Sequence, residues 1–423
     1  RFGAFTGNRK ALFQRTAETL GLHYAMRWPR QELESARPLR RSPLYDRLQA
    51  RGARFGARMG WERPLYFDEP GAKPPPYGFD RPGWLPRMEI EQNAVRNAAA
   101  IFDQTSFSKF VVQGRDSLSF LQRLCANDLS APIGRMTYTA LLNARGGFES
   151  DLTIMRTGER EFFVVTGTAQ TTRDADWIRR NIGDAFVTLT DVTGAWAVLS
   201  VMGPRATEIL AQASNADLSL EAIPSGAFAE IDLGYARVRA ARMSYVGGPG
   251  LELYVPTEFA VHVYDSLIEA GTPLGLVDAG YYTIDALRIE AGRRAWGAEL
   301  GPDETPIEAG LMHAVKLDKP GFIGRDALLA RRAQGVTKRL AILVLDDPHA
   351  WAWGGEGILR DGMAAGEVIS AGWSARLGRM VVMGYVRADR PIDRAWVESG
   401  RYELDIAGLR VAAQVQAKPP FTG

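Results

Sequence analysis

Short apolar runs separated by glycine-bearing turns dominate the middle of the chain. Residues 107–113 (FSKFVVQ) predict a strand, Gly114 follows, and 115–125 (RDSLSFLQRLC) has the apolar spacing of a helix. The same order returns in AWAVLSVM, Gly203 and PRATEILAQA at 195–213. Two strand–glycine–helix units about 90 residues apart indicate paired α+β halves.

Between these units the pattern alternates with a period of two. A run ending at Leu142 leads into a double-glycine turn, and the runs 148–155 and 161–166 follow, separated by a Thr-Gly turn. Glycine turns between alternating runs predict antiparallel hairpins, so we expect a three-strand meander. Upstream, residues 89–103 (EIEQNAVRNAAAIFD) predict one helix.

The two ends of the chain differ from its middle. Residues 10–60 are rich in Arg, Leu and Ala, with a Ser-Pro helix start at Ser42, and the proline-rich stretch 64–87 predicts a linker wrapped over a surface. After Lys338, short strands separated by glycine and charged turns predict a small barrel or sandwich. Those strands are RLAILVLDD, GEVISAGWS, RMVVMGYV, YELDIAG and RVAAQVQA.

Composition narrows the class of protein. A length of 423 residues suggests two to four domains. The chain has 51 Lys and Arg residues against 49 Asp and Glu residues, so its net charge is too small to attract nucleic acid or an anionic membrane. We therefore expect a small-molecule partner. No apolar run is long enough to span a membrane, and the single Cys125 excludes an internal disulfide, so we expect the cytosol or an organelle matrix. Because the chain starts at Arg1 rather than Met, we also expect further residues upstream.

Common catalytic motifs are absent. The sequence contains neither a G-x-G-x-x-G dinucleotide motif nor a P-loop, and its four histidines lack metal-ligand spacing, so we expect no metal site. Asp151 stands out instead, in the middle of an apolar strand. Alternation places Glu149, Asp151, Thr153 and Met155 on one face, and pattern alone favours a solvent-facing edge.

Longer stretches resemble a known family. LLNARGGFESDLTIMR (141–156) is similar to a hairpin of the aminomethyltransferases, the glycine-cleavage T proteins. The C-terminal halves of dimethylglycine and sarcosine dehydrogenases are closer still. The further stretches that carry this resemblance are RDADWIRRNI, DVTGAWAVLSVMGPRA, RMSYVGGPGLELYVP, LRIEAGRRAWGAELGPDETPIEAGLMHAVKLDKPGFIGRDAL and, for the segment after the flavin domain, ARPLRRSPLYDRLQARGARFGARMGWERPLYF.

The resemblance implies an α+β cloverleaf with a central folate site and a C-terminal all-β barrel, preceded by a remnant of a flavin enzyme. We divide the chain into 1–87 (end of the flavin-enzyme region and linker), 88–335 (folate-binding domains) and 336–423 (barrel). In that family a flavin domain oxidises a small N-methyl amine, and the folate part captures the one-carbon unit. The cofactors implied are tetrahydrofolate and an FAD held by a missing N-terminal domain or a partner subunit.

The resemblance also implies roles for individual residues. Asp151 matches the catalytic aspartate, which would accept a proton as 5,10-methylenetetrahydrofolate forms. We expect its burial without a cationic partner to raise its pKa. Glu252 matches the pterin-binding glutamate, whose two oxygens suit a pair of N–H donors. Without the resemblance, Glu252 would be interpreted as the solvent face of a strand.

Six further positions match the surroundings of the folate. Tyr138, Phe163 and Val165 would flank its rings, with a plain strand core as the alternative for all three and nearly as good a fit for Val165. Arg288 matches a folate-contacting arginine, with a helix pair to Asp285 as the alternative. Weaker candidates for the pocket wall are Tyr245 and Trp373.

Two departures from the family pattern stand near these positions. A Gly-Gly-Pro-Gly loop, 247–250, replaces an acidic residue just before Glu252, and Arg173-Asp174 stands where relatives often carry a histidine. We expect these changes to affect the choice of amine more than folate binding.

Three functions remain open from the sequence. The favoured one is a folate-dependent one-carbon acceptor of a demethylating flavoenzyme in the cytoplasm, or in the mitochondrial matrix if the source is eukaryotic. The alternatives are a catalytically silent scaffold subunit of a flavoprotein complex and a flavin-independent folate-dependent demethylase. The flavin-enzyme segment argues against the demethylase.

Overall fold

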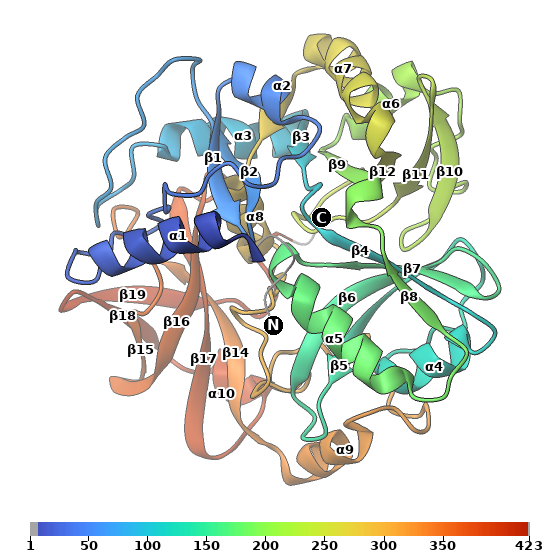
Figure 1. The fold of residues 1–423 in the computed structure, drawn as a ribbon. Helices are drawn as coiled ribbons and strands as arrows, with labels where there is room; N and C mark the ends of the chain where they lie inside the picture. Colours follow the sequence, from blue (N-terminus) through green and yellow to red (C-terminus); the bar gives the residue numbers. More distant parts are fainter. Residues whose placement is uncertain (1–6, 422–423) are drawn as a thin grey trace.

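A computed structural model describes residues 7–421. Three β-rich lobes surround a common centre, and the N-terminal segment crosses their outer side (Figure 1). The elements of that segment are α1 (Arg9–Gly21), α2 (Tyr45–Ala50), β1 (Ala53–Arg58) and β2 (Trp61–Phe67), the last two forming a hairpin. The expected linker from residue 64 therefore begins with a strand, and only the loop from 68 to 84 behaves as predicted.

The first lobe contains the expected meander. Its five-stranded sheet has the order β5-β6-β7-β4-β8, and α4 and α5 pack on one face through Phe120, Leu121 and Ile178. The elements are β4 (Ser108–Gln113), α4 (Ser117–Leu124), β5 (Met136–Leu142), β6 (Phe148–Arg156), β7 (Glu161–Thr166), α5 (Thr171–Ile182) and β8 (Thr188–Asp191).

The second lobe is a six-stranded sheet with the order β10-β11-β12-β9-β3-β13. Helices α6 and α7 pack on one face, and α3 and α8 pack on part of the other. Its elements are α3 (Leu85–Asn97), β3 (Ala99–Asp103), β9 (Trp196–Met202), α6 (Ala206–Ala213), β10 (Phe228–Leu233), β11 (Ala236–Ala241), β12 (Gly250–Pro256), α7 (Ala260–Gly271), β13 (Leu276–Ala279) and α8 (Tyr281–Glu290).

The prediction of one helix over residues 89–103 is wrong in its second half. The helix ends at Asn97, and 99–103 form β3, which pairs with β9 and β13 in the middle of the sheet. All five residues of β3 are buried. A strand covered on both faces has no alternation, and therefore its sequence cannot be told from a buried helix by periodicity.

The third lobe is a closed barrel with the strand order β14-β17-β16-β15-β18-β19. All five predicted strands are present, and the short β15 was not predicted. Its elements, with the preceding α9, are α9 (Arg325–Gln334), β14 (Val336–Leu345), β15 (Gly357–Arg360), β16 (Met363–Ser374), β17 (Arg379–Ile392), α10 (Arg394–Glu398), β18 (Tyr402–Ile406) and β19 (Leu409–Val415).

The two strand–glycine–helix units are confirmed, and both glycines are sterically required. Gly114 has φ +141°, and a Cβ there would lie 2.0 Å from the carbonyl oxygen of Phe186. Gly203 has φ +134°, and its Cβ would lie 2.5 Å from the carbonyl oxygen of Ala98. In each unit the glycine lets another backbone segment approach the turn.

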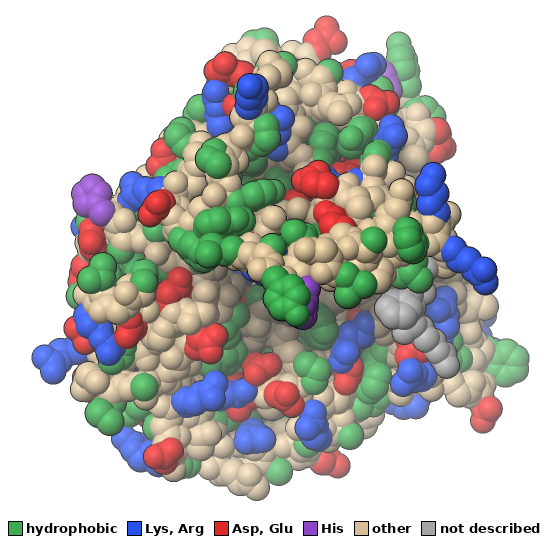
Figure 2. Space-filling view, turned by 60° about the vertical axis from the view of Figure 1, so that its left-hand side comes forward, with side chains coloured by type: hydrophobic (Ala, Val, Ile, Leu, Met, Phe, Trp, Pro, Cys, Tyr) green, Lys and Arg blue, Asp and Glu red, His purple; other side chains and the backbone are tan. Residues whose placement is uncertain are grey.

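The first two lobes pack sheet against sheet. Met155, Phe163 and Val165 of the five-stranded sheet form one buried cluster with Val198 and Tyr254 of the six-stranded sheet. On the outer surface, acidic and basic side chains are interspersed and the face in Figure 2 is hollowed near its centre. No helix within residues 7–421 is long and apolar enough to cross a bilayer.

Candidate active site

Asp151 lies at the centre of β6, the second strand of the five-stranded sheet. It is half-buried, and its face of β6 also carries Met155, which packs between the two sheets. Tyr138 projects from the neighbouring β5, and its Oη donates a hydrogen bond of 3.0 Å to Asp151 Oδ2. The solvent-facing edge favoured by pattern alone is therefore wrong, because a second sheet covers this face.

The surroundings of Asp151 favour its protonated form. Burial raises its pKa to about 6, and the negative charge of Glu299 acts in the same direction. Hydrogen bonds from Tyr138 and Gln170 stabilise the carboxylate and offset part of this shift. The expected rise of the Asp151 pKa is confirmed.

Glu252 lies on β12, opposite Ser200 of β9, and is buried. Tyr254 Oη donates to its Oε1, and Ser200 Oγ donates to its Oε2 over 3.4 Å. Alternation places Glu252 and Tyr254 on the same face, the one turned toward the five-stranded sheet. Burial raises the pKa of Glu252, while these two hydrogen bonds and the charge of Lys109 lower it.

The interface between the two sheets brings several candidates together. Phe163 meets the ring of Tyr254 edge-to-face with centroids 5.4 Å apart, and Val165 belongs to the same buried cluster. The ring of Tyr138, which donates to Asp151, stacks on His313 with centroids 6.2 Å apart. The apolar candidates therefore lie in the same contact region as the two acids.

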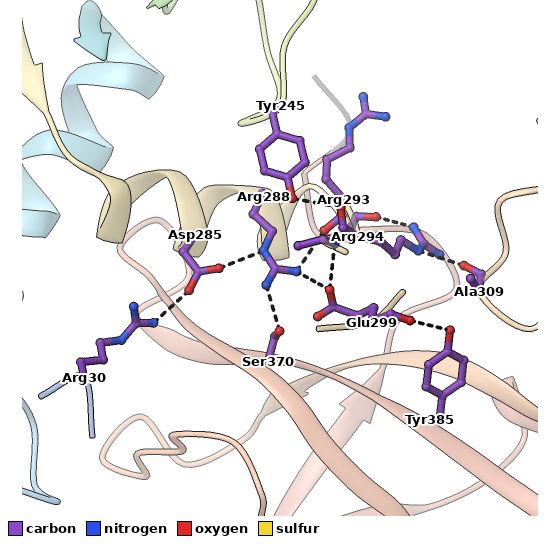
Figure 3. Close-up of polar contacts among 12 residues, drawn as sticks. Arg30, Tyr245, Asp285, Arg288, Arg293, Arg294, Glu299, Ala309, Ser370 and Tyr385 are labelled. Atoms are coloured by element: carbon purple, nitrogen blue, oxygen red, sulfur yellow. Dashed lines mark hydrogen bonds and ion pairs between the residues drawn. The ribbon is translucent and has the colours of Figure 1, made fainter. Parts of the chain in front are cut away.

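Arg288 is held by a network of protein groups (Figure 3). Its Nε donates to Asp285 at 3.0 Å, its Nη1 to Glu299 at 2.8 Å and its Nη2 to Ser370 of the barrel at 2.9 Å. The expected helix pair with Asp285 is present, together with two further partners. With Nη1 also bonded to the Arg293 carbonyl, four of the five N–H groups are engaged.

Tyr245 and Trp373 occupy different surroundings. Tyr245 Oη donates to the Arg294 carbonyl at 2.9 Å, and its pKa is raised by burial and by the charges of Asp151 and Glu299, while that of Arg288 lowers it. Tyr245 therefore belongs to the region of Asp151. Trp373 packs in the barrel core instead, stacked on Trp351 at 6.0 Å, with Nε1 donating to Glu89 at 2.7 Å.

Two charged residues near the site were not predicted. Lys109 is fully buried on β4, where its Nζ donates to the carbonyls of Thr105 and Trp196 at 2.8 and 2.7 Å and burial lowers its pKa to about 7. Glu299 is fully buried in an irregular segment and its Oε1 has no hydrogen-bond partner within residues 7–421. Neither position has a sequence signal, because the partners come from distant segments.

The glycine loop before Glu252 is closely packed. Gly250 has φ +155°, and a Cβ there would lie 2.5 Å from the carbonyl oxygen of Val201. Pro249 also accepts a backbone hydrogen bond of 2.9 Å from Gly203, the glycine of the second repeated unit. The loop therefore fixes the start of β12, two residues before Glu252.

Comparison with known families identifies the fold. The model for the GCVT N-terminal domain matches residues 44–319, and the model for the glycine cleavage T-protein C-terminal barrel domain matches 338–422. The chain belongs to the glycine cleavage T-protein family. A third model, the FAD dependent oxidoreductase central domain, matches residues 1–42. A solved aminomethyltransferase T of the glycine cleavage system from Bartonella henselae superposes with a TM-score of 0.77 at 26% identity. It covers 91% of this chain and 98% of its own.

The curated relatives of this chain include a regulatory subunit, an oxidase and a dehydrogenase. The chain is 38% identical to the mitochondrial pyruvate dehydrogenase phosphatase regulatory subunit of Mus musculus and 37% identical to 4-methylaminobutanoate oxidase (formaldehyde-forming) of Paenarthrobacter nicotinovorans. It is 32% identical to the mitochondrial sarcosine dehydrogenase of Homo sapiens. Each match covers 99% of this chain and 50% of the relative, so the chain spans about half their length.

The comparisons confirm the resemblance to the sarcosine and dimethylglycine dehydrogenases, the cloverleaf fold with its C-terminal barrel and the segment of a flavin enzyme. The division at residues 87/88 and 335/336 and the roles of single residues stay predictions.

Proposed function

We propose that the chain is the tetrahydrofolate-dependent one-carbon acceptor of a flavoenzyme that oxidises an N-methyl amine, and that it forms 5,10-methylenetetrahydrofolate from an iminium or formaldehyde unit. The observation that carries this proposal is Asp151, a carboxyl group with a pKa of about 6, bonded to Tyr138 beside the contact of the two sheets. Glu252 lies buried on the opposing sheet. Membership of the T-protein family supports the proposal.

The residues at this interface fit a reduced folate. Glu252 accepts one hydrogen bond on each oxygen, and a carboxylate has about four lone-pair sites, so two remain for the paired N–H donors of a pterin. Tyr138, which is partly exposed, offers aromatic surface for a ring, whereas Phe163 is buried in the contact between the two sheets. Bound tetrahydrofolate would supply two amine nitrogens as nucleophiles.

In this mechanism Asp151 acts as the base. Above pH 6 it is largely ionised and can take the proton that an amine nitrogen loses as the methylene bridge closes. The hydrogen bond from Tyr138 holds the carboxylate in place.

We assign the oxidative step to a part of the protein beyond this chain. The match of residues 1–42 to an FAD dependent oxidoreductase domain, and the half-length coverage of the relatives, support an FAD-bearing domain or subunit as partner. The substrate would be a small N-methyl amine of the dimethylglycine or sarcosine type. The mitochondrial matrix or the cytoplasm is the proposed location, in line with the mitochondrial relatives.

Anaerobic calorimetric titration with tetrahydrofolate tests this function. We expect saturable binding near one site per chain.

Asp151→Asn should abolish methylenetetrahydrofolate formation and keep folate affinity within a few-fold, because the amide retains the shape but cannot take the proton. Equal losses of affinity and turnover would contradict its role as a base.

Glu252→Ala should have the opposite effect. Removing the acceptor of the pterin donors should weaken folate binding by about 1–3 kcal/mol. Tyr254→Phe is the matched control, because it removes a donor to Glu252 and leaves the carboxylate in place. Unchanged affinity in Glu252→Ala would refute the pterin assignment.

A second candidate is a regulatory subunit without catalysis. The 38% identity to a phosphatase regulatory subunit over 99% of this chain favours it. Well-folded protein that binds no tetrahydrofolate in the same titration would support this candidate over the enzyme.

A further inference from the structure

A cavity that contains none of the proposed folate residues lies between α9 and the barrel. Its volume is about 580 Å³, which is within the range of sites for small molecules. The lining residues come from the end of α9, from β14 and β17, from the cap of α10 and from the segment 307–312. The cavity is therefore a second place where a ligand could bind.

Three arginines line this cavity. Arg332 lies in the last turn of α9, Arg339 lies on β14 and Arg390 lies near the end of β17. Arg339 Nε donates to the Ile392 carbonyl at 3.0 Å. None of the three guanidinium groups has a carboxylate partner in the part of the chain that the structure describes. Like charges without a counter-ion repel one another, and a bound anion would offset that repulsion.

The one carboxylate among the described lining residues, Asp393, is engaged elsewhere. Its Oδ1 accepts a hydrogen bond of 2.8 Å from the Trp396 N–H and thereby caps α10. The carbonyl end of α9, at Gly335, adds a partial negative charge. Three arginines against one aspartate still leave the lining with an excess of positive charge.

Irregular strand pairing shapes one wall of the cavity. The ladder between β14 and β17 is interrupted between Val336 and Lys338, and residues 388–391 of β17 have no partner on β14. Arg390 lies in this bulge, and its side chain is exposed. Bulges re-aim side chains and are frequent next to binding sites.

The rest of the lining is largely apolar. Ile307 and Met312 contribute from the segment 307–312, and the buried Ile392 contributes from β17. The Leu340 N–H donates to the Glu308 carbonyl at 3.0 Å, which holds this segment against β14. An apolar wall beside guanidinium groups suits a molecule that joins an apolar body to an anionic group.

We propose that this cavity binds a small organic anion, with carboxylate or phosphate oxygens on an apolar body, between Arg332, Arg339 and Arg390. Guanidinium groups recognise both kinds of oxygen through paired hydrogen bonds. The site goes beyond the proposed function and does not depend on it.

Calorimetric titration of the whole chain with phenyl phosphate and with phenylsuccinate tests the proposal. At least one of them should bind saturably at one site per chain, and roughly tenfold more tightly than inorganic phosphate, because the ring adds apolar contact. Tighter binding of phenyl phosphate would support a phosphate monoester as the ligand, and tighter binding of phenylsuccinate a dicarboxylate. Binding of neither, or equal binding of inorganic phosphate, would overturn the proposal.

Variants of the lining locate the bound anion. Arg332→Gln and Arg390→Gln should each weaken its binding roughly three- to tenfold, because each removes a cation from the lining. Both side chains are exposed and lack an ion pair among the described residues, so the variants should fold. Arg331→Gln is the matched control, because this neighbouring exposed arginine of α9 does not line the cavity. Equal weakening in Arg331→Gln would indicate unspecific attraction and overturn the proposal.

A cross-titration separates this site from the folate site. Glu252→Ala should leave the affinity for the tighter of the two anions unchanged, and Arg390→Gln should leave that for tetrahydrofolate unchanged. Loss of anion binding in Glu252→Ala would assign the anion to the folate site and overturn the proposal. Protein that binds the anion but no tetrahydrofolate would refute the proposed function and leave this site standing.

Discussion

Asp151 is held where its charge is unfavourable, and that has a consequence for stability. Its pKa is about 6 in the fold against a usual 3.8, so the unfolded chain ionises first as the pH rises. The cost of the buried charge is absent below pH 4, grows as the pH rises from 4 to 6, and is full above pH 6. Relief of this cost should therefore stabilise the fold at neutral pH.

Asp151→Asn should accordingly raise the free energy of unfolding by roughly 1–3 kcal/mol at pH 7.5, because it removes the buried charge. The gain should vanish near pH 4. Urea denaturation of both proteins at the two pH values measures it. A variant that is equally destabilised at both would contradict the environment described for Asp151.

Tyr138→Phe tests the donor to Asp151. The hydrogen bond favours the ionised form, and therefore its loss should raise the pKa of Asp151 above about 6. The acidic limb of the pH dependence of kcat/KM should move to higher pH by roughly 0.5–1 unit. An acidic limb that stays in place would exclude Tyr138 as a partner of the proposed base.

The sequence predicted which residues of β6 share a face but not that a second sheet covers it. Alternation grouped Asp151 with Met155 correctly, whereas the burial of that face depends on Tyr254, about 100 residues away. The strand pattern singled out Asp151 without a role, and only the family resemblance gave a role to Asp151 and to Glu252. Lys109 and Glu299 depend on distant partners, Trp196 and Arg288, and a pattern of single residues cannot reveal them.

At the scale of elements, the repeated strand–glycine–helix turn is a site of high steric demand. Gly114→Ala should cost about 2–4 kcal/mol of stability, because its Cβ would collide with the Phe186 carbonyl and its φ is positive. Gly194→Ala is the matched control, since its Cβ meets nothing within 4 Å. Thermal unfolding of the two variants compares them, and equal melting temperatures would contradict the close approach.

Element boundaries were predicted well where glycine or charged turns separate the strands. Alternation and glycine turns located β6, β7 and the barrel strands. The error at β3 arose because a strand buried on both faces, directly after a helix, gives a continuous apolar run. The strand β15 was not predicted, because its four residues are too few to show a periodic pattern.

At the scale of the whole molecule, Arg288 joins α8 to the barrel and to the segment around Glu299. Arg288→Met should cost about 3–5 kcal/mol, because it leaves the fully buried Glu299 charge unpaired. Arg288→Met with Glu299→Gln should recover part of that loss. Chemical denaturation of the single and double variants measures this coupling, and additive losses would show that the pair contributes no specific stability.

The N-terminal segment is joined to the rest of the molecule in the same way. Arg30 donates to Asp285 at 2.9 Å, one ion pair from Arg288, and Arg37 is paired at 2.6 Å with Glu62, whose side chain is 2% exposed. A shortened gene that starts at residue 44, where the T-protein match begins, would leave the buried Glu62 without its counter-ion. Expression of the T-protein lobes alone should therefore retain residues 28–43, because Arg30 and Arg37 form ion pairs with the lobes although they lie outside the family match.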